Sequence, residues 1–226
     1  MKKFVHLNDL GDLQVPDRKN VDGRRVYVTP NGDYYPSITS ILGSQPKPGI
    51  DQWKAKVGEK EANRIIKEST KIGTAVHTLC EDYLLNKNLY CDDKEVLSVF
   101  NRLRFMLGNI DNIYGLEIPL YSDILRVAGT ADCIADWNGV LSVIDFKTSR
   151  KAKREDWIQD YYTQAFFYSA AFFEMTGALP EQVVILVAVR DSFEVQVFKK
   201  NHNEMDIYME KLINIMKTEP YVVQQH

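Results

Sequence analysis

Two apolar runs near the middle of the chain form its clearest pattern. They cover residues 126–137 and 140–146 and are joined by Asn138-Gly139. This two-residue insert is the one that most strongly favours a tight turn between antiparallel strands. We therefore predict a β-hairpin at this point of the chain.

Side-chain alternation along the second strand separates a polar face from an apolar one. Asp145 and Lys147 should point to one face, whereas Ile144 and Phe146 should point to the other, into a core. Asp132 lies in the first strand, which pairs with the second. The hairpin should thus bring two carboxylates and one ammonium group to one end of a sheet.

Weaker patterns place the other elements. Residues 1–23 are polar with scattered glycine and proline, which indicates a loosely held arm, and Ser37 or Thr39 is the candidate N-cap of a short helix at 36–42. Gly73-Thr74 should restart a helix. Periodicity and turn residues predict a small hairpin at 25–35, helices at 51–71, 75–85, 93–108, 155–175 and 203–216, a strand at 116–121, and a second hairpin from 183–190 and 193–198.

The order of these elements predicts an α+β (α/β) fold with a central mixed β-sheet flanked by helices. Mixed pairing is expected because a long helix, not a tight turn, joins the third and fourth strands. A chain of 226 residues should form a single domain. We expect an N-terminal arm and hairpin over about residues 1–45 and the core of the domain over about residues 72–200.

Composition narrows the class of protein. Hydrophobic residues make up 45% and charged residues 26%, as in an ordinary globular protein. The formal net charge of −3 argues against nucleic-acid binding through bulk positive charge, although acidic residues that hold cations reverse the local field. Cys80, Cys91 and Cys133 are too few and too dispersed for a disulfide framework, which favours a reducing compartment.

Targeting and membrane signals are not found in the sequence. The N-terminus lacks the apolar run of a signal peptide, and no segment approaches the roughly 18 apolar residues that span a bilayer. We therefore expect a cytoplasmic protein without membrane contact, from a bacterial or phage-infected cell.

The acidic hairpin is the main candidate for chemistry. Carboxylate oxygens are the ligands that magnesium and manganese prefer, and a lysine beside them can steady a phosphate or a water that loses its proton. Asp132, Asp145 and Lys147 would supply these groups. The alternative is a solvated strand face with a weak ion pair.

The predicted helices offer further candidates. Trp53 shares one side of helix 51–71 with a row of cations, which suits a nucleic-acid strand. The alternative is a solvated face, since acids also lie on this helix and Gly58 is a candidate break in it. His77 becomes a candidate ligand only if its helix lies against the acidic hairpin. The cations on helix 51–71 are Lys56, Lys60, Arg64, Lys67 and Lys71. Helix 155–175 carries a stripe of aromatic and amide side chains, which consists of Trp157, Tyr161, Gln164 and Tyr168. Such a stripe is usually part of a core, with its polar ends exposed.

Six short pieces of the chain form an ordered set over roughly residues 35–170. They are Tyr35 to Leu42, Trp53, Gly73 to His77, Gly129 to Asp132, Asp145 to Thr148, and Gln164 to Tyr168. In order and spacing they resemble the PD-(D/E)XK nuclease superfamily, and within it the RecB-like exonucleases of the mitochondrial genome maintenance and phage type. The resemblance implies a restriction-endonuclease-like core.

The resemblance also implies a metal site. Asp132, Asp145 and the backbone carbonyl of Phe146 would bind one or two Mg²⁺ or Mn²⁺ ions, with His77 as an additional ligand. Lys147 would be the catalytic lysine, acting with Asp132 and Asp145. No iron–sulfur cluster is expected, because members that carry one need four placed cysteines.

Substrate contacts follow from the same resemblance. Gln164 and Tyr168 match the Gln-x-x-x-Tyr motif and would contact the substrate near the site. Glu117 matches a motif acid only loosely and would support the site from behind. The other candidate nucleic-acid contacts are Trp53, Thr148, Tyr161, Ser37 and Thr39.

These inferences predict a metal-dependent DNA exonuclease that hydrolyses phosphodiester bonds and prefers single-stranded DNA or free ends. Such an enzyme would serve DNA recombination or repair, with replication or recombination proteins as further partners. The alternatives are a structure-selective endonuclease with the same site and a catalytically silent nucleic-acid-binding module.

Overall fold

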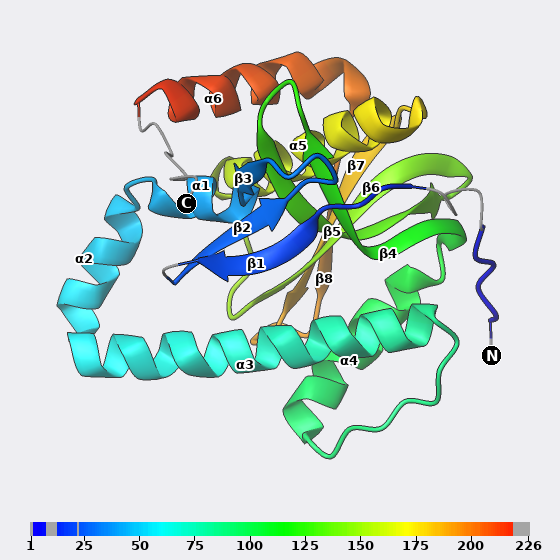
Figure 1. The fold of residues 1–226 in the computed structure, drawn as a ribbon. Coiled ribbons are helices and arrows are strands. Elements are labelled where there is room, and N and C mark those ends of the chain that lie inside the picture. Colours follow the sequence, from blue (N-terminus) through cyan, green and yellow to red (C-terminus); the bar gives the residue numbers. More distant parts are fainter. Residues whose placement is uncertain (1, 8–12, 22, 219–226) are drawn as a thin grey trace.

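A five-stranded mixed β-sheet is the centre of the fold. The computed structural model describes residues 2–7, 13–21 and 23–218 (Figure 1). The sheet order is β4-β5-β6-β7-β8, and only the β6–β7 pair is parallel, so the predicted α+β fold with a mixed sheet is confirmed. The strands are β4 (Ile110–Ser122), β5 (Val127–Trp137), β6 (Val140–Ser149), β7 (Gln182–Val189) and β8 (Val195–Asn201).

The turn between β5 and β6 has the geometry that its sequence predicts. Asn138 has a φ of 53° and Gly139 a φ of 79°, and the two-residue turn that matches the twist of a hairpin needs positive φ at both positions. The register pairs Cys133 with Ile144. Asp132 and Asp145 therefore stand at the next position of the two strands, side by side.

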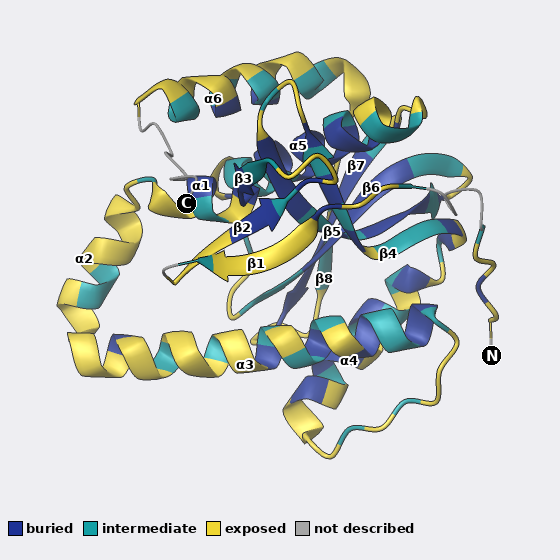
Figure 2. Cartoon of the chain, in the orientation of Figure 1, coloured by how far each residue is buried: buried dark blue, intermediate teal, exposed yellow. Residues whose placement is uncertain are grey.

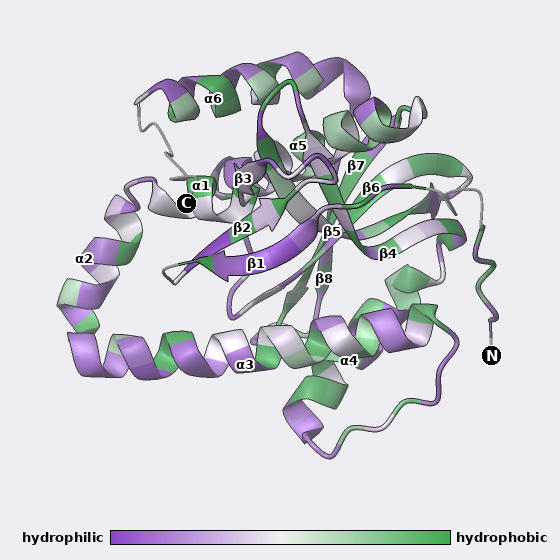
Figure 3. Cartoon of the chain, viewed as in Figure 1, coloured by the Kyte–Doolittle hydropathy of each residue, from purple (hydrophilic) through white to green (hydrophobic). Residues whose placement is uncertain are grey.

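Helices cover both faces of this sheet. On one face lie α3 (Glu59–Leu84) and α4 (Lys94–Leu107), and on the other lie α5 (Gln159–Thr176) and α6 (Met205–Thr218) (Figure 1). Each face has its own apolar core, and β6 contributes to both. Figures 2 and 3 show that the central strands are buried and apolar. The side chain of Asp145, on β6, is therefore enclosed by protein.

A second, three-stranded sheet is built from the N-terminal region. It contains β1 (Asp17–Val21), β2 (Arg24–Val28) and β3 (Tyr34–Pro36), all antiparallel. Tyr27 and Tyr35 of this sheet pack with Ala128 of β5, so the small sheet lies against the central one. The hairpin predicted at 25–35 is confirmed by β2 and β3.

The prediction of a loosely held N-terminal arm is wrong for most of that segment. β1 pairs with β2 over five residues. Phe4 is buried and its N–H donates to Asn86 Oδ1 at 2.9 Å. Residues 1, 8–12 and 22 lie outside the described part of the chain. The adjacent strand β2 orders residues 17–21, and a contact with the distant Asn86 orders Phe4.

The helix boundaries between residues 48 and 84 differ from the prediction. The predicted helix 51–71 is divided into α2 (Pro48–Val57) and the start of α3, because Gly58 has a φ of 87°. The predicted restart at Gly73-Thr74 is wrong, since α3 is continuous there. A Cβ on Gly73 would lie 3.3 Å from Thr148 Oγ1, so this glycine allows a close approach of α3 to β6.

The division at Gly58 also breaks the predicted basic stripe. Trp53 and Lys56 lie on α2, whereas the other cations of the stripe lie on α3. Arg64 forms ion pairs with Glu61 at 2.8 Å and with Glu68 at 3.0 Å. No residue of α2 is buried, and Figure 2 shows α2 and the first turns of α3 as an exposed segment.

The remaining elements are close to their predicted ranges. β4 begins at Ile110, six residues earlier than predicted. On α5, Phe173 was expected on the buried side but is 49% exposed, whereas Tyr168 is only 1% exposed. The short helices α1 (Ile38–Ser44), η1 (Glu155–Trp157) and η2 (His202–Glu204) complete the described elements. The division into an arm over about 1–45 and a core over about 72–200 stays a prediction.

Within residues 2–7, 13–21 and 23–218, no helix combines the length and the apolar character that crossing a bilayer requires.

Gly129 determines how closely α1 and α5 approach β5. A Cβ at this position would lie 2.8 Å from Ile38 Cγ2 and 2.8 Å from Tyr168 Cε1. Both side chains are buried and have no room to withdraw. The absence of a side chain at Gly129 therefore allows both α1 and α5 to pack closely against β5.

We expect Gly129→Ala to destabilise the protein by about 1–3 kcal/mol, because overpacking a closed core forces its neighbours to move. In a protein of this size the melting temperature should fall by about 2–10 °C. Thermal unfolding followed by circular dichroism measures this. The control is Gly43→Ala in α1, where a Cβ meets nothing within 4 Å. An equal melting temperature for both variants would contradict the packing role.

Candidate metal and nucleic-acid site

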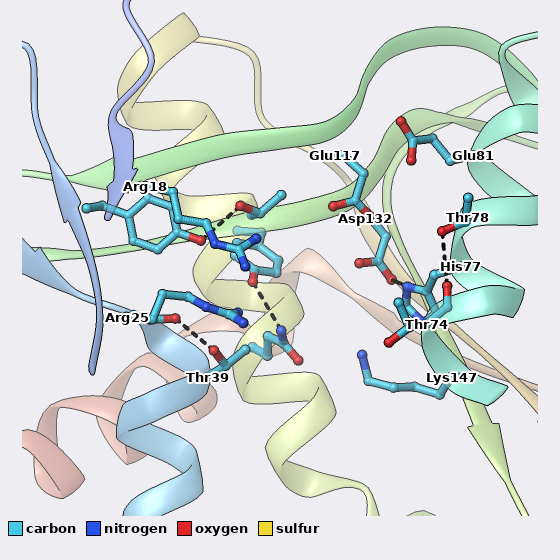
Figure 4. Close-up of a pocket in the computed structure, with 16 residues that line it drawn as sticks. Arg18, Arg25, Thr39, Thr74, His77, Thr78, Glu81, Glu117, Asp132 and Lys147 are labelled. Atoms are coloured by element: carbon cyan, nitrogen blue, oxygen red, sulfur yellow. Dashed lines mark hydrogen bonds and ion pairs between the residues drawn. The ribbon is translucent and has the colours of Figure 1, made fainter. Parts of the chain in front are cut away.

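A polar cavity of about 520 Å³ opens between the small sheet, α3, α5 and the central sheet (Figure 4). Its lining comes from β1, β2, α1, α3, β4, β5, β6 and α5, so segments far apart in sequence meet there. Asp132 and Lys147 of the central hairpin lie on one side of the cavity. The cavity therefore brings the central hairpin together with the small sheet and with α1, α3 and α5.

His77, Glu117 and Asp132 form a compact group on that side. One potential ligand atom from each lies within 4.8 Å of the others. His77 comes from α3, Glu117 from β4 and Asp132 from β5. His77 Nδ1 lies 3.6 Å from Asp132 Oδ2. The condition that the sequence set for His77, a helix lying against the acidic hairpin, is thus met.

Glu117 has an unusual backbone for a strand residue. Its φ is 45°, in the left-handed region that residues with a Cβ rarely adopt. Its neighbours Leu116 and Ile118 pair with Cys133 and Ala131, so Glu117 stands opposite Asp132. Backbone strain of this kind persists where the surrounding structure holds it, often at functional sites. It places the Glu117 carboxyl beside that of Asp132.

The carboxyl groups of Glu117 and Asp132 lie close enough to repel each other when both are ionised. Desolvation of the carboxyl within the cavity, and then the charge of Asp132, raise the pKa of Glu117 to about 7, while His77 and Arg18 act in the opposite direction. Two carboxyls that share a site resist joint ionisation unless a cation lies between them. A cation held between these carboxyls would therefore be stabilised.

Asp145 lies deeper, next to this group. It is 2% exposed, and its Oδ1 accepts a hydrogen bond from Lys147 Nζ at 2.5 Å. Burial raises the pKa of Asp145 to about 6 against the opposing charge of Lys147, and Asp132 adds to the rise. Burial lowers the pKa of Lys147, but the charges of Asp145 and Asp132 outweigh it and the net change is upward. Lys147 is therefore a protonated ammonium.

Asp132 is fixed by the backbone of the neighbouring strand. The N–H of Phe146 donates to Asp132 Oδ2 at 2.8 Å. This contact holds the carboxylate between β5 and β6, and the same oxygen lies 3.6 Å from His77 Nδ1. The predicted role of the Phe146 carbonyl as a ligand stays a prediction.

The residues present fit a divalent cation. Two carboxylates and one imidazole form a donor set that suits Mg²⁺ or Mn²⁺. Asp145 Oδ2 is buried and has no hydrogen-bond partner among the described residues. Such an orphaned oxygen is costly without a positive partner. The structure thus brings together His77 and Asp132 of the predicted ligands, adds Glu117, and keeps Asp145 adjacent through its pair with Lys147.

Four of the predicted nucleic-acid contacts line the cavity. Gln164 Nε2 donates to Tyr168 Oη at 3.1 Å, one turn apart on α5. Ser37 and Thr39 share a hydrogen bond between their hydroxyl oxygens at 2.7 Å. Ser37 is the N-cap residue of α1, as expected, but its side chain makes no capping bond. These polar groups instead face the cavity.

The other predicted contacts lie outside the lining. Tyr161 has its ring 5.2 Å from Lys147 Nζ, so it borders the catalytic candidate. Thr148 packs against Gly73 of α3. Trp53 is on α2 and does not line the cavity. Their roles in nucleic-acid binding stay predictions.

Several cavity residues were missed by the sequence analysis. Arg18 and Arg25 belong to β1 and β2, and Tyr27 Oη lies 2.9 Å from Thr130 Oγ1 across the two sheets. Arg18 had no signal in the sequence because its segment was interpreted as an arm, and Arg25 was placed in the predicted hairpin 25–35 without a role. Thr130 could have been found, since it belongs to the motif that ends at Asp132.

Comparisons with known proteins support a distant relationship. No family model matches the chain. Mitochondrial genome maintenance exonuclease 1 of Mus musculus is 27% identical over 128 residues, which are 52% of this chain and 38% of the mouse protein. The aligned segment therefore spans less than two thirds of that relative.

Among solved structures, SSO0001 is 17% identical, with a TM-score of 0.37, over 79% of this chain and 75% of its own. Scheffersomyces stipitis Rai1 in complex with (3'-NADP)+ and calcium ion is 22% identical, with a TM-score of 0.22, over 40% of this chain and 24% of its own. Both similarities of shape are loose. The chain is a distant homologue of mitochondrial genome maintenance exonuclease 1, a RecB-like nuclease of the PD-(D/E)XK superfamily, as its sequence motifs indicated.

Proposed function

We propose that this protein is a divalent-metal-dependent deoxyribonuclease that hydrolyses phosphodiester bonds, in keeping with its distant exonuclease relative. The observation that carries the proposal is the meeting of His77, Glu117 and Asp132 in one cavity with the Asp145–Lys147 pair. The three acids and the lysine come from strands β4, β5 and β6, which the core holds rigidly. A rigid support is what a catalytic arrangement needs.

The chemistry of the substrate explains this set of residues. A phosphodiester is anionic and repels hydroxide, so cleavage needs positive charge at the phosphate and a nucleophile formed near neutral pH. Bound Mg²⁺ or Mn²⁺ supplies Lewis acidity and lowers the pKa of water. Asp132, Glu117 and His77 would hold the ion, with Asp145 next to them.

Lys147 would act directly on the reacting groups. It lines the cavity, and its ammonium is held in place by Asp145 and by the ring of Tyr161. A fixed ammonium can donate to a phosphate oxygen and stabilise the charge that develops as the bond breaks. Asp145 therefore has two functions, orienting Lys147 and adding negative charge beside the metal group.

Single-stranded DNA or a free end is the substrate we infer. Asp132, Lys147 and His77 line a cavity walled by α3, α5 and the small sheet, and the exposed Glu117 lies at the same cavity. A flexible single strand can bring its backbone to Lys147 in such a place more easily than a stiff duplex. An exonuclease of this kind would act in DNA recombination or repair, alongside replication or recombination proteins.

We expect Lys147→Ala and Asp145→Asn each to lower cleavage of single-stranded DNA by at least about 100-fold, the effect of removing one preorganised group that stabilises developing charge. Both changes are internal, so circular dichroism must show a folded protein. Degradation of an end-labelled strand in Mg²⁺ measures the loss.

Matched controls lie on α6, away from the cavity. Asp206→Asn and Lys217→Ala remove the same charges from exposed positions and should cleave at the rate of the unaltered protein. Folded Lys147→Ala or Asp145→Asn with full activity would refute the assignment of the site.

Metal binding should couple to stability and pH. The raised pKa of Asp145, about 6, means that the folded protein binds this proton more tightly than the unfolded chain does. This contribution to stability is present below pH ~4 and is lost as the pH rises through about 6. A bound cation would replace the proton, so Mg²⁺ should stabilise the protein more at pH 8 than at pH 5.

Thermal melts with saturating Mg²⁺ or with EDTA test this coupling. At a concentration about 100 times the Kd, the ion should raise the melting temperature at pH 8 by about 5–10 °C. Asp132→Asn should abolish most of the increment. An increment that is absent, or equal at the two pH values, would contradict the metal site.

A circular single strand separates the exonuclease from an endonuclease with the same site. We expect Mg²⁺-dependent degradation of linear single-stranded DNA and survival of the circle, because an exonuclease needs an end. Gel analysis of both substrates measures this. Linearisation of the circle would favour the endonuclease, and binding of DNA without cleavage in Mg²⁺ or Mn²⁺ would favour a silent binding module.

A further inference from the structure

We propose that Arg18 and Arg25 form a second phosphate-binding group, which holds the single-stranded backbone on the wall of the cavity opposite the metal group. The inference rests on the proposed nuclease function and extends it to the small N-terminal sheet. It assigns a substrate contact to two residues for which the motifs give no role.

The register of the small sheet directs both arginines to the cavity. Arg18 stands opposite Tyr27, and Asn20 stands opposite Arg25, so these residues share one face of the β1–β2 pair. Tyr27, Arg18 and Arg25 all line the cavity. Figure 4 shows the two arginines on the side away from Glu117, Asp132 and His77.

Among the described residues, these two guanidinium groups have no carboxylate partner. The other arginines of the described chain each interact with a neighbouring group. Arg102 donates to a backbone carbonyl, Arg104 lies over an aromatic ring, and Arg24 also has an interaction. The arginines that pair with a carboxylate are Arg64, Arg126, Arg150, Arg154 and Arg190. Two unpaired cations that face a cavity are suited to an anion from outside.

Neutral polar groups also belong to the lining. They include the side chains of Gln164, Tyr168 and Thr39. A strand that crosses the cavity would thus meet cations at one wall, the metal group with Lys147 at the other, and amide and hydroxyl groups of the same lining. Phosphates repeat along a strand, and the planar guanidinium matches their oxygens.

A simpler role for the arginines is to offset the acidic group across the cavity. The charge of Arg18 does reach Glu117, whose pKa it lowers against the larger effect of desolvation. In that case, removing the arginines would alter Mg²⁺ affinity but would leave the salt dependence of DNA binding unchanged. The two roles therefore predict different measurements.

The experiment measures binding of a fluorescein-labelled oligothymidylate by anisotropy over a series of salt concentrations. It uses the Lys147→Ala protein with Mg²⁺, so that the strand stays intact. Arg18→Gln and Arg25→Gln, singly and together, are compared with Lys19→Gln, which removes one charge from the opposite face of β1. Steady-state cleavage is measured in parallel without the Lys147 change.

We expect each arginine substitution to weaken binding about tenfold at low salt, the effect of losing one charged hydrogen bond. The slope of log affinity against log salt should become shallower by about 0.7 for each arginine. KM should rise while kcat is retained. Replacing both arginines by lysine should restore the slope but not the full affinity, and Lys19→Gln should change none of these.

A double glutamine variant with the slope and KM of Lys19→Gln would overturn the inference and leave the nuclease function intact, provided that the unaltered protein cleaves. If the unaltered protein neither binds nor cleaves single-stranded DNA in Mg²⁺ or Mn²⁺, the proposed function fails, and this inference fails with it.

Discussion

The hydrogen bond from the Phe146 N–H to Asp132 Oδ2 is the contact on which the candidate site depends. It joins β5 and β6 just beyond their paired segment, which begins at the Asn138-Gly139 turn and extends into the core. Because the bond uses backbone of one strand and a side chain of the next, it fixes Asp132 relative to Asp145 and Lys147 without help from any helix. The two acids and the lysine are thus aligned by a hairpin that the local sequence itself encodes.

The parts of the structure that local signals specify were predictable. Asn138 and Gly139 adopt the positive φ that their residue types favour, and apolar periodicity placed the helices on both faces of the sheet. Gly58 and Gly73 show where this reasoning ends. Gly58 interrupts the helical segment, whereas Gly73 lies within α3 and allows it to approach Thr148. Only the contact of Gly73 with Thr148 distinguishes the two glycines.

The position of Glu117 beside Asp132, and that of Arg18 and Arg25 in the cavity lining, could not be predicted for the same reason. Glu117 reaches Asp132 through a left-handed backbone in the middle of a strand, against the preference of its residue type. Arg18 faces the cavity because β1 pairs with β2. The sequence of β1 is polar and lacks the apolar alternation that predicts a strand. Strand pairing, which outweighs local propensity at these positions, brings both groups to the cavity.

The charge distribution explains how a protein with a net charge of −3 would bind an anionic chain. The sum of charges governs solubility and weak, long-range attraction, whereas a bound strand responds to the charges within a Debye length of its phosphates. Here the acids lie together with the imidazole of His77 where a divalent cation would reverse their field, and the unpaired guanidinium groups lie on the facing wall. Such an arrangement gives little attraction at a distance and specific attraction inside the cavity. It therefore favours a strand that enters the cavity over one that lies across the surface.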